Sequence, residues 1–195
     1  MLNFWILLGA AAWLYALSVL TRAKQPALHF WVGSVGLFAL LAFSSRAYFV
    51  WFLSSLVTAV TGWWGHLSGY YSVSYIHSLI SITNDRGLIL LFVDYECSGI
   101  IETLAYFSLL WFYPLYNRAA KVKLTLFGGA YIFLANVFRL SLIATILYYA
   151  GSGAFFWVHS IFGRLIFCVL VIILYYNVFT RVQFRRGLEG EASNG

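Results

Sequence analysis

Long apolar runs separated by short basic loops are the feature that most limits what this chain can fold into. Several runs approach the length that crosses the roughly 30 Å hydrocarbon core of a bilayer. They are residues 2–20, 27–43, 99–116, 124–149 and 156–180. Because 63% of the residues are hydrophobic and only 9% are charged, a water-soluble domain of 195 residues could not bury this much apolar surface. The pattern therefore predicts an α-helical integral membrane protein with about five to six transmembrane helices.

The first run, residues 2–20, is expected to stay in the protein as a transmembrane helix. A secretory signal peptide carries a basic segment before its apolar core and a small-residue cleavage site after it. Neither feature is present here. We therefore interpret this run as a retained first span.

Positive charge indicates an orientation for the chain. The loops at residues 21–27 and 117–123 and the tail at 181–195 hold most of the 12 Lys and Arg residues. Basic loops stay on the cytoplasmic side of a membrane, so the net charge of +6 reflects topology and we expect no nucleic-acid partner. Cys97 and the loop at residues 150–155 then face outward.

Residues 47–65 are long and apolar enough to cross the membrane, but a crossing would require a return span before Cys97. Residues 66–90 contain several polar and charged side chains and provide no such span. We therefore expect a helix that lies along the outer face or dips into the membrane and returns. Small and polar residues recur on it at roughly helical spacing: Ser54, Thr58, Thr61, Gly65, Gly69 and Ser72.

Two runs rich in β-branched and aromatic residues follow, at 73–82 and 88–95. They flank Asn84 to Gly87, a sequence typical of a tight turn, so we expect an outward β-hairpin that leads to Cys97. The chain then forms one membrane domain built from consecutive parts. These parts are two spans at 1–46, the outer helix and hairpin at 47–96, a core of three spans at 97–180 and a cytoplasmic tail at 181–195.

Charged residues inside the apolar runs gather in one layer of the predicted membrane. At about 1.5 Å of rise per residue, Arg139, Glu102 and Arg164 lie about 22 to 25 Å above the inner edge. Cys97 and His159 lie about 30 to 33 Å above it, near the outer boundary. A nucleophile, a base and intramembrane cations thus fall within about two helical turns of one another.

Each of these residues also has a purely structural interpretation. An arginine inside a membrane costs at least about 2.5 kcal/mol, which marks Arg139 and Arg164 as functional candidates. Either arginine could instead form an ion pair with Glu102 that only holds helices together. His159 could be an ordinary interfacial histidine, and its case as a base depends on the depth that it shares with Cys97.

Cysteine and histidine residues outside this layer indicate no further chemistry. Cys168 lies within an apolar run, so we expect it to be inert core packing. The two cysteines show no C-x-x-C spacing, and His29, His66 and His77 show no spacing typical of metal ligands. We therefore expect neither a metal site nor a disulfide scaffold.

Three segments, in this order along the chain, resemble the exosortase/archaeosortase family of multi-pass cysteine transpeptidases. They are residues 96–100 (Glu-Cys-Ser-Gly-Ile), 135–139 (Ala-Asn-Val-Phe-Arg) and 159–164 (His-Ser-Ile-Phe-Gly-Arg). The likeness covers residues 72–180, and all three segments lie at outward ends of predicted spans. The chain is shorter than the large Gram-negative members, with fewer N-terminal spans and no appended domain, and is similar to the small branch of Gram-positive bacteria.

The resemblance implies an enzyme of the bacterial plasma membrane with its active site facing outside. Such an enzyme cleaves a C-terminal membrane-anchored sorting signal of exported proteins through a thioester and transfers them to an acceptor, either a membrane lipid or a glycan. The family's cysteine, arginine and histidine correspond to Cys97, Arg139 and His159. Their implied roles are nucleophile, stabilising cation, and general base and acid. No cofactor is implied.

Asn136, Glu102 and Arg164 are expected to support this site. Asn136 and Glu102 would orient the guanidinium of Arg139, while Arg164 would pair with Glu102 or reach the lipid headgroups. Two other classes of protein stay open. A transporter would bury Arg and Glu nearer the midplane and show internal repeats, which the sequence does not show. A membrane scaffold without enzymatic activity would have no use for Cys, Arg and His in one layer.

Overall fold

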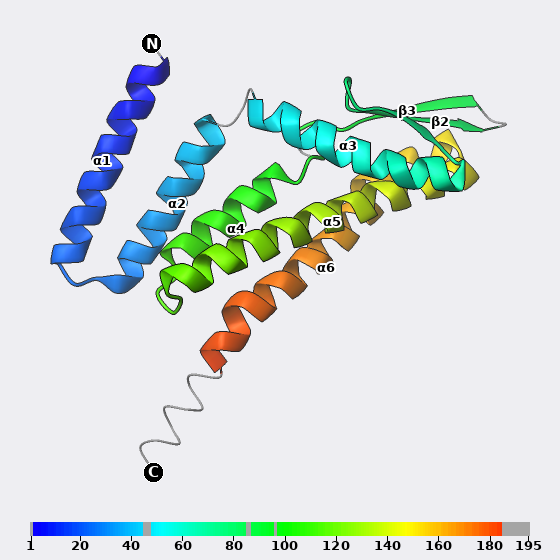
Figure 1. The fold of residues 1–195 in the computed structure, drawn as a ribbon. Helices are drawn as coiled ribbons and strands as arrows, with labels where there is room; N and C mark the ends of the chain where they lie inside the picture. Colours follow the sequence, from blue (N-terminus) through cyan, green and yellow to red (C-terminus); the bar gives the residue numbers. More distant parts are fainter. Residues whose placement is uncertain (1, 45–47, 85–86, 96, 185–195) are drawn as a thin grey trace.

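The computed structural model describes the chain apart from residues 1, 45–47, 85–86, 96 and 185–195. It is mostly helical and carries one small antiparallel sheet (Figure 1). The helices are α1 (Leu2–Arg22), α2 (Pro26–Ser44), α3 (Tyr48–Ser68), α4 (Ile100–Phe112), α5 (Arg118–Ala150) and α6 (Gly163–Tyr175). The strands are β1 (Ser72–Ser74), β2 (Leu79–Asn84) and β3 (Gly87–Phe92). A 3₁₀ turn at Ser152–Ala154 precedes α6, and π-helical turns at Phe156–Phe162 and Tyr176–Thr180 extend it at both ends.

Within the described residues, three helical stretches are long and apolar enough to cross a membrane. They are Pro26–Ser44, Arg118–Ala150 and the stretch Ser152–Phe184 that includes α6. Two shorter apolar helices, Ile6–Arg22 and Ile100–Phe112, occupy the positions of further expected spans. The chain is therefore a transmembrane protein with several candidate spans, and the full set of five to six stays a prediction.

Helices α4 and α5 differ in extent from their predicted spans. α4 ends at Phe112 rather than at residue 116, because Pro114 holds the preceding Tyr113 in an extended conformation with φ −66° and ψ 122°. α5 begins at Arg118 rather than at residue 124, since the side chain of Asn117 caps it by accepting a hydrogen bond of 2.8 Å from the next turn. With 33 residues, α5 is about 50 Å long and exceeds the hydrocarbon core, so it tilts or extends beyond it.

The N-terminal helices pack closely because glycine and tryptophan meet where they cross. The indole Nε1 of Trp13 in α1 donates a hydrogen bond of 2.9 Å to the carbonyl of Val32 in α2. Gly36 lies directly against the Trp13 ring, and any Cβ at that position would overlap the indole. The same helix α2 also packs on α4, where Gly33 meets the ring of Phe112.

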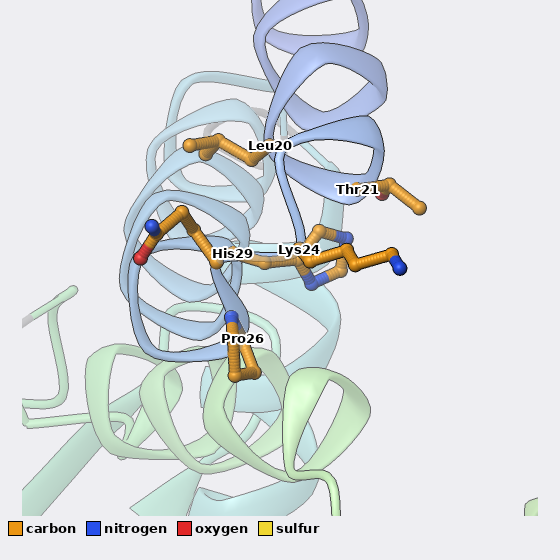
Figure 2. A pocket seen from close by; sticks show the side chains of 6 residues that line it. Leu20, Thr21, Lys24, Pro26 and His29 are labelled. Carbon is orange, nitrogen blue, oxygen red and sulfur yellow. The ribbon is translucent and has the colours of Figure 1, made fainter.

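The basic loops lie at one end of the molecule and the sheet lies at the other (Figure 1). The turn between α1 and α2, the turn between α4 and α5 and the C-terminal end of the last helix share the end remote from the sheet. The first of these turns forms a shallow hollow lined by Lys24, Pro26 and His29, among others (Figure 2). This is the arrangement that the predicted orientation requires, with basic loops inside and the sheet outside.

Helix α3 buries the first part of the stripe of small and polar residues noted in the sequence. The helix ends at Ser68, so Gly69 and Ser72 lie outside it, and both are exposed. Ser54, Thr58 and Thr61 are at most 3% exposed, on the side that packs against the sheet and α5. The hydroxyl of Tyr71 donates a hydrogen bond of 3.0 Å to the carbonyl of Thr61, which ties the helix to the chain leading into β1. α3 is one unbroken helix beside the sheet and does not turn back on itself, and its position relative to the membrane stays a prediction.

The sheet has three strands in the order β1-β2-β3, not the two of the predicted hairpin. The expected strand at 73–82 is interrupted between β1 and β2, where Ser78 takes the left-handed conformation with φ 49°. β2 and β3 pair from Leu79 opposite Phe92 to Asn84 opposite Gly87, as the hairpin prediction requires. Asp85 and Arg86 of the predicted turn lie outside the described residues.

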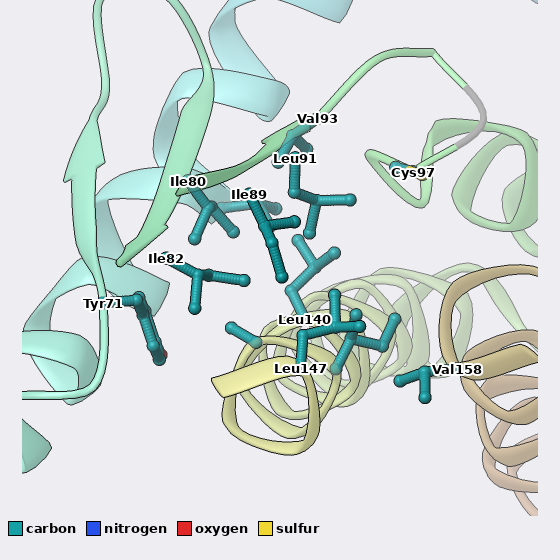
Figure 3. Close-up of a cluster of buried hydrophobic side chains, with 13 residues drawn as sticks. Tyr71, Ile80, Ile82, Ile89, Leu91, Val93, Cys97, Leu140, Leu147 and Val158 are labelled. Atoms are coloured by element: carbon teal, nitrogen blue, oxygen red, sulfur yellow. The ribbon is translucent and has the colours of Figure 1, made fainter. Parts of the chain in front are cut away.

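Two hydrophobic clusters hold the fold together. In the first, the inner face of the sheet covers the outer half of α5, and Cys97 and Val158 lie at its edge (Figure 3). Its strand residues are Ile80, Ile82, Ile89 and Leu91, with Val93 directly after β3, and its α5 residues are Leu140, Ile143, Ala144 and Leu147. The second cluster joins α4, α5 and α6 through Tyr106, Leu110, Ile132, Ala135, Phe167, Leu174 and Val178. The first cluster therefore sets the position of the sheet, and with it the position of Cys97.

Candidate active site

Cys97 lies in a tight turn between β3 and α4, outside the helices. Its backbone N–H donates a hydrogen bond of 3.1 Å to Oδ1 of Asp94, and the hydroxyl of Ser98 donates to the carbonyl of Tyr95 at 2.9 Å. The Cys97 side chain is only 8% exposed. The turn is thus locked by its own side chains, and the thiol is held beneath the surface.

His159 brings an imidazole to this thiol from the far end of the chain. Its Nε2 lies 3.7 Å from Sγ of Cys97, within the hydrogen-bonding range of sulfur. The residue belongs to the π-helical turn Phe156–Phe162, a form that is rare and often found at functional sites. The ring of Phe155 stacks on the imidazole, with centroids 5.4 Å apart and planes at 19°. The turn and the stacked ring together define the orientation of His159.

Arg139 and Asn136 lie one turn apart on α5, and both donate to the backbone carbonyl of Cys97. The distances are 2.8 Å from Nδ2 of Asn136 and 3.2 Å from Nη2 of Arg139. Asn136 is fully buried and Arg139 is 7% exposed, with its guanidinium 5.0 Å from the ring centroid of Phe167 on α6. Asn136 therefore forms a hydrogen bond with the backbone of Cys97, instead of orienting Arg139 as predicted.

Gly99 ends the turn that carries Cys97, a conformational role that was not predicted from the sequence. It precedes α4 in the left-handed conformation with φ 75°, which strains any other residue. A Cβ there would lie 3.4 Å from Nδ2 of Asn136, an ordinary van der Waals distance, so the backbone conformation and not lack of space is what favours glycine. A glycine two positions after a candidate nucleophile is the signal in the sequence that could have predicted a left-handed turn at this point.

Burial raises the pKa of the Cys97 thiol to about 11. The guanidinium of Arg139 acts in the opposite direction, while the carboxylate of Asp94 raises the pKa further by its charge and by hydrogen bonding. The thiol is therefore protonated at neutral pH, and a reaction at sulfur requires a base to remove its proton.

The other predicted residues are farther from the thiol. Glu102 is half-buried on α4 within electrostatic range of Arg139, as is Arg164, which is exposed on α6. The side chain of Arg139 donates to Cys97 and not to Glu102, and its Nε has no hydrogen-bond partner in the described part of the chain. Neither Glu102 nor Asn136 therefore orients the guanidinium through a hydrogen bond.

The prediction that Cys168 is core packing is wrong, because its side chain is exposed on α6. It shares this outer face with Leu165, Val169 and Ile172, all of them exposed. An apolar helix face of this kind contacts lipid chains when the helix spans a membrane. In a membrane, lipid instead of protein would then provide the apolar surroundings of Cys168.

The described residues contain no group of three or more His, Cys, Asp or Glu side chains that could hold a metal ion. What the site does contain is a buried thiol beside an imidazole, with a guanidinium and an amide at the backbone of the thiol residue. In a membrane protein, these groups define the class of candidate thiol-dependent membrane enzymes.

Comparison with known protein families shows to which family of membrane enzymes the chain belongs. Residues 1–176 match the transmembrane exosortase family, and the chain belongs to that family. Membership implies a cysteine transpeptidase-type enzyme that processes sorting signals on protein substrates. The resemblance seen in three segments is thus confirmed, and it extends over the N-terminal helices. No curated protein and no solved structure matches the chain.

Proposed function

We propose that the protein cleaves exported proteins next to a C-terminal membrane anchor and transfers them to an acceptor, with Cys97 as the nucleophile. The observation that carries this proposal is the 3.7 Å approach of Sγ of Cys97 to Nε2 of His159, two residues 62 positions apart in the sequence. A thiol with a raised pKa needs such a base, and the imidazole of His159 lies within reach of it.

The first half of the reaction forms a thioester. Nε2 of His159 takes the proton of the Cys97 thiol while sulfur attacks the carbonyl carbon of the scissile peptide bond, whose oxygen becomes an oxyanion. When the intermediate collapses, the carbon–nitrogen bond breaks and the leaving amine takes the proton from the imidazolium. The exported part then remains on Cys97 as an acyl group, and the membrane anchor departs with a new amino terminus.

The second half regenerates the thiol. An acceptor with a nucleophilic amine or hydroxyl gives its proton to His159 and attacks the thioester carbonyl. The Cys97 sulfur leaves and recovers the proton from the imidazolium. The product is the exported protein joined to the acceptor, for which a membrane lipid or a glycan fits a site at the outer membrane surface. The bond that is exchanged supplies the energy, so the scheme needs no cofactor.

Arg139 is the proposed cation for the charge that develops at this site. Its guanidinium is buried against Phe167, where a fixed charge acts more strongly than it does in water. One nitrogen donates to the Cys97 carbonyl at rest, and Nε has no partner in the described residues. Arg139 therefore has donor capacity left for an oxyanion or a thiolate next to Cys97.

The decisive experiment is mass spectrometry of Cys97 from cells that express the chain with exported proteins carrying a C-terminal span. We expect an acyl adduct on the Cys97 peptide that neutral hydroxylamine releases, as it does other thioesters. Cys168→Ala is the matched control and should retain both adduct and processing, whereas Cys97→Ala should lose both. Processing at the normal level in Cys97→Ala would remove Cys97 from the mechanism.

A further inference from the structure

Strand β3 has a free edge. The strand order β1-β2-β3 leaves β3 paired with β2 on one side, and no strand in the described part of the chain pairs with its other side. Edge strands expose unpaired N–H and C=O groups, and proteins usually protect them with charge, proline or a covering element. The sequence of β3, Gly-Leu-Ile-Leu-Leu-Phe, contains neither charge nor proline.

The register shows which backbone groups lie on this edge. The N–H of Val93 donates to the carbonyl of Ser78 at 2.8 Å, one step beyond the pair of Leu79 and Phe92. In an antiparallel pair the backbone groups of successive residues point alternately toward the partner and away from it. It follows that the N–H and C=O groups of Leu88, Leu90 and Phe92 point away from β2.

The side chains of β3 are apolar on both faces. Its inner face, Ile89 and Leu91, is buried in the cluster on α5 (Figure 3). The outer face exposes Leu88 at 62%, Leu90 at 45% and Phe92 at 62%. Strands with two apolar faces are typically covered on both, whereas within the described residues the outer face of β3 stays exposed.

The strand also leads directly to Cys97. Phe92 and Cys97 are five positions apart, a stretch that spans at most about 18 Å. Val93, directly after β3, and Cys97 belong to the same hydrophobic cluster on α5 (Figure 3). A second extended chain lying along the free edge would therefore have its end near the thiol.

We propose that the free edge of β3 binds the substrate segment next to the scissile bond as an added strand. This inference rests on the proposed function, since that reaction needs an extended peptide at Cys97. Backbone hydrogen bonds to Leu88, Leu90 and Phe92 hold the segment, and alternate substrate side chains contact the exposed apolar side chains of β3. The edge thus selects an extended backbone, largely independently of substrate sequence.

The test uses a peptide probe whose sequence need not match the substrate. The probe is an acetylated hexapeptide of alternating threonine and valine that ends in an alanine chloromethyl ketone. Sulfur of Cys97 displaces chloride and forms a thioether, and the thiol proton passes to His159 and then to solvent. Chloroacetamide, which reacts at the same sulfur without a peptide, measures the reactivity of the thiol alone. The full chain is used in lipid nanodiscs, and modification of Cys97 is followed by mass spectrometry.

Pairing along one edge makes a specific prediction for this probe. The peptide should modify Cys97 at least about fivefold faster than chloroacetamide at equal intrinsic reactivity, since each added hydrogen bond contributes a few-fold in affinity. Of two peptides N-methylated at alternate residues, one should lose this acceleration and the other should keep it, because only alternate N–H groups face β3. Equal rates for both methylated peptides and the parent would overturn the proposal.

Leu90 offers a matched pair of variants. Leu90→Pro removes the outward N–H and keeps an apolar side chain, whereas Leu90→Ser keeps the N–H and removes the apolar side chain. We expect Leu90→Pro to lose the peptide acceleration about fivefold with an unchanged chloroacetamide rate, and Leu90→Ser to stay within about twofold of the parent chain. The opposite result would mean that the outer face contacts the membrane and does not pair with a peptide.

Failure of the proposed function gives a different result. If neither reagent modifies Cys97 while Cys97→Ala still processes exported proteins, the thiol is not the nucleophile, and the edge proposal falls with it. If Cys97→Ala is inactive and the methylated peptides are equivalent to the parent, only the edge proposal is wrong.

Discussion

The side-chain amide of Asn136 donates a hydrogen bond of 2.8 Å to the backbone carbonyl of Cys97. Asn136 is fully buried on α5, and Gly99 ends the turn at Cys97 in the left-handed conformation. Because the amide holds the main chain and not the thiol, Asn136 acts as a positioning residue for Cys97. Asn136 would affect the reaction by fixing the distance between Sγ of Cys97 and Nε2 of His159.

The first prediction concerns this contact. Asn136→Ala leaves the buried carbonyl with Arg139 as its remaining donor, a loss of about 1 to 3 kcal/mol, and we expect processing to fall by about tenfold or more. Asn84→Ala is the matched control, because Asn84 makes the same kind of bond, 3.0 Å to the carbonyl of Tyr148 on α5. Both variants should lower thermal stability by similar amounts.

The readout that separates positioning from stability is the chloroacetamide reaction of Cys97 over a range of pH. Asn136→Ala should change the rate or the midpoint of this profile, because the thiol moves relative to His159 and Arg139. Asn84→Ala should leave the profile unchanged. Identical profiles in Asn136→Ala and the parent chain would show that Asn136 contributes only to folding.

The second prediction concerns the raised pKa of Cys97, which burial and Asp94 bring to about 11 against the effect of Arg139. Alkylation requires the thiolate, so its rate should rise with pH up to about pH 11. Asp94→Asn keeps an oxygen that can accept the Cys97 N–H but removes the negative charge. Its midpoint should therefore move to lower pH, and alkylation at pH 8 should become faster.

Asp94→Glu is the control for this shift, because it retains a carboxylate close to Cys97. Its alkylation profile should resemble that of the parent chain. A midpoint that stays in place or rises in Asp94→Asn would mean that the carboxylate does not act on the thiol, and the account of its pKa would be wrong.

The meeting of Cys97, Arg139 and His159 could be anticipated from the sequence because depth along a helix depends only on rise per residue. Charge in the loops gave the direction of each span, and the two together placed these residues in one layer. The structure brings all three into one site, with contacts of 3.7 Å and 3.2 Å at Cys97. Depth alone was sufficient to predict that these three residues meet, because the side chain of Arg139 is long and Cys97 and His159 lie near helix ends.

Rotation about the helix axes could not be derived in the same way. Whether Asn136 binds Arg139 or Cys97 depends on how α5 is turned against α4, and whether Cys168 faces protein or lipid depends on α6. In a membrane both faces of a helix are apolar, so the periodicity that separates core from surface in soluble proteins is weak. The π-helical turn at Phe156–Phe162 adds a further change of register that no local residue pattern indicates.

The third prediction concerns membrane topology. Ser152 and Ala119 are both exposed and lie at opposite ends of α5 in the structure. In a Cys97→Ala and Cys168→Ala background, Ser152→Cys should react with a membrane-impermeant thiol reagent in intact cells, and Ala119→Cys should react only after the membrane is opened. Native Cys97 is a poor reporter, since it is 8% exposed and protonated. Labelling of Ala119→Cys in intact cells would invert the orientation and place the site in the cytoplasm.

The last prediction separates Arg139 from Arg164. Arg139 is buried, donates to the Cys97 carbonyl and lies over Phe167, whereas Arg164 is exposed on α6. Removing a cation that stabilises developing charge typically costs about 100-fold or more, so Arg139→Ala should lose nearly all processing per enzyme molecule. Arg139→Lys should also fail, because one ammonium cannot hold the Cys97 carbonyl and an oxyanion in the fixed geometry of a guanidinium. Arg164→Ala should lower the amount of protein in the membrane more than its activity.

The measurement is cleavage of a tagged substrate, identified by its adduct on Cys97 and normalised to enzyme level, in all three variants. Normal cleavage in Arg139→Ala would leave the Cys97 and His159 pair to act with a different donor at the oxyanion.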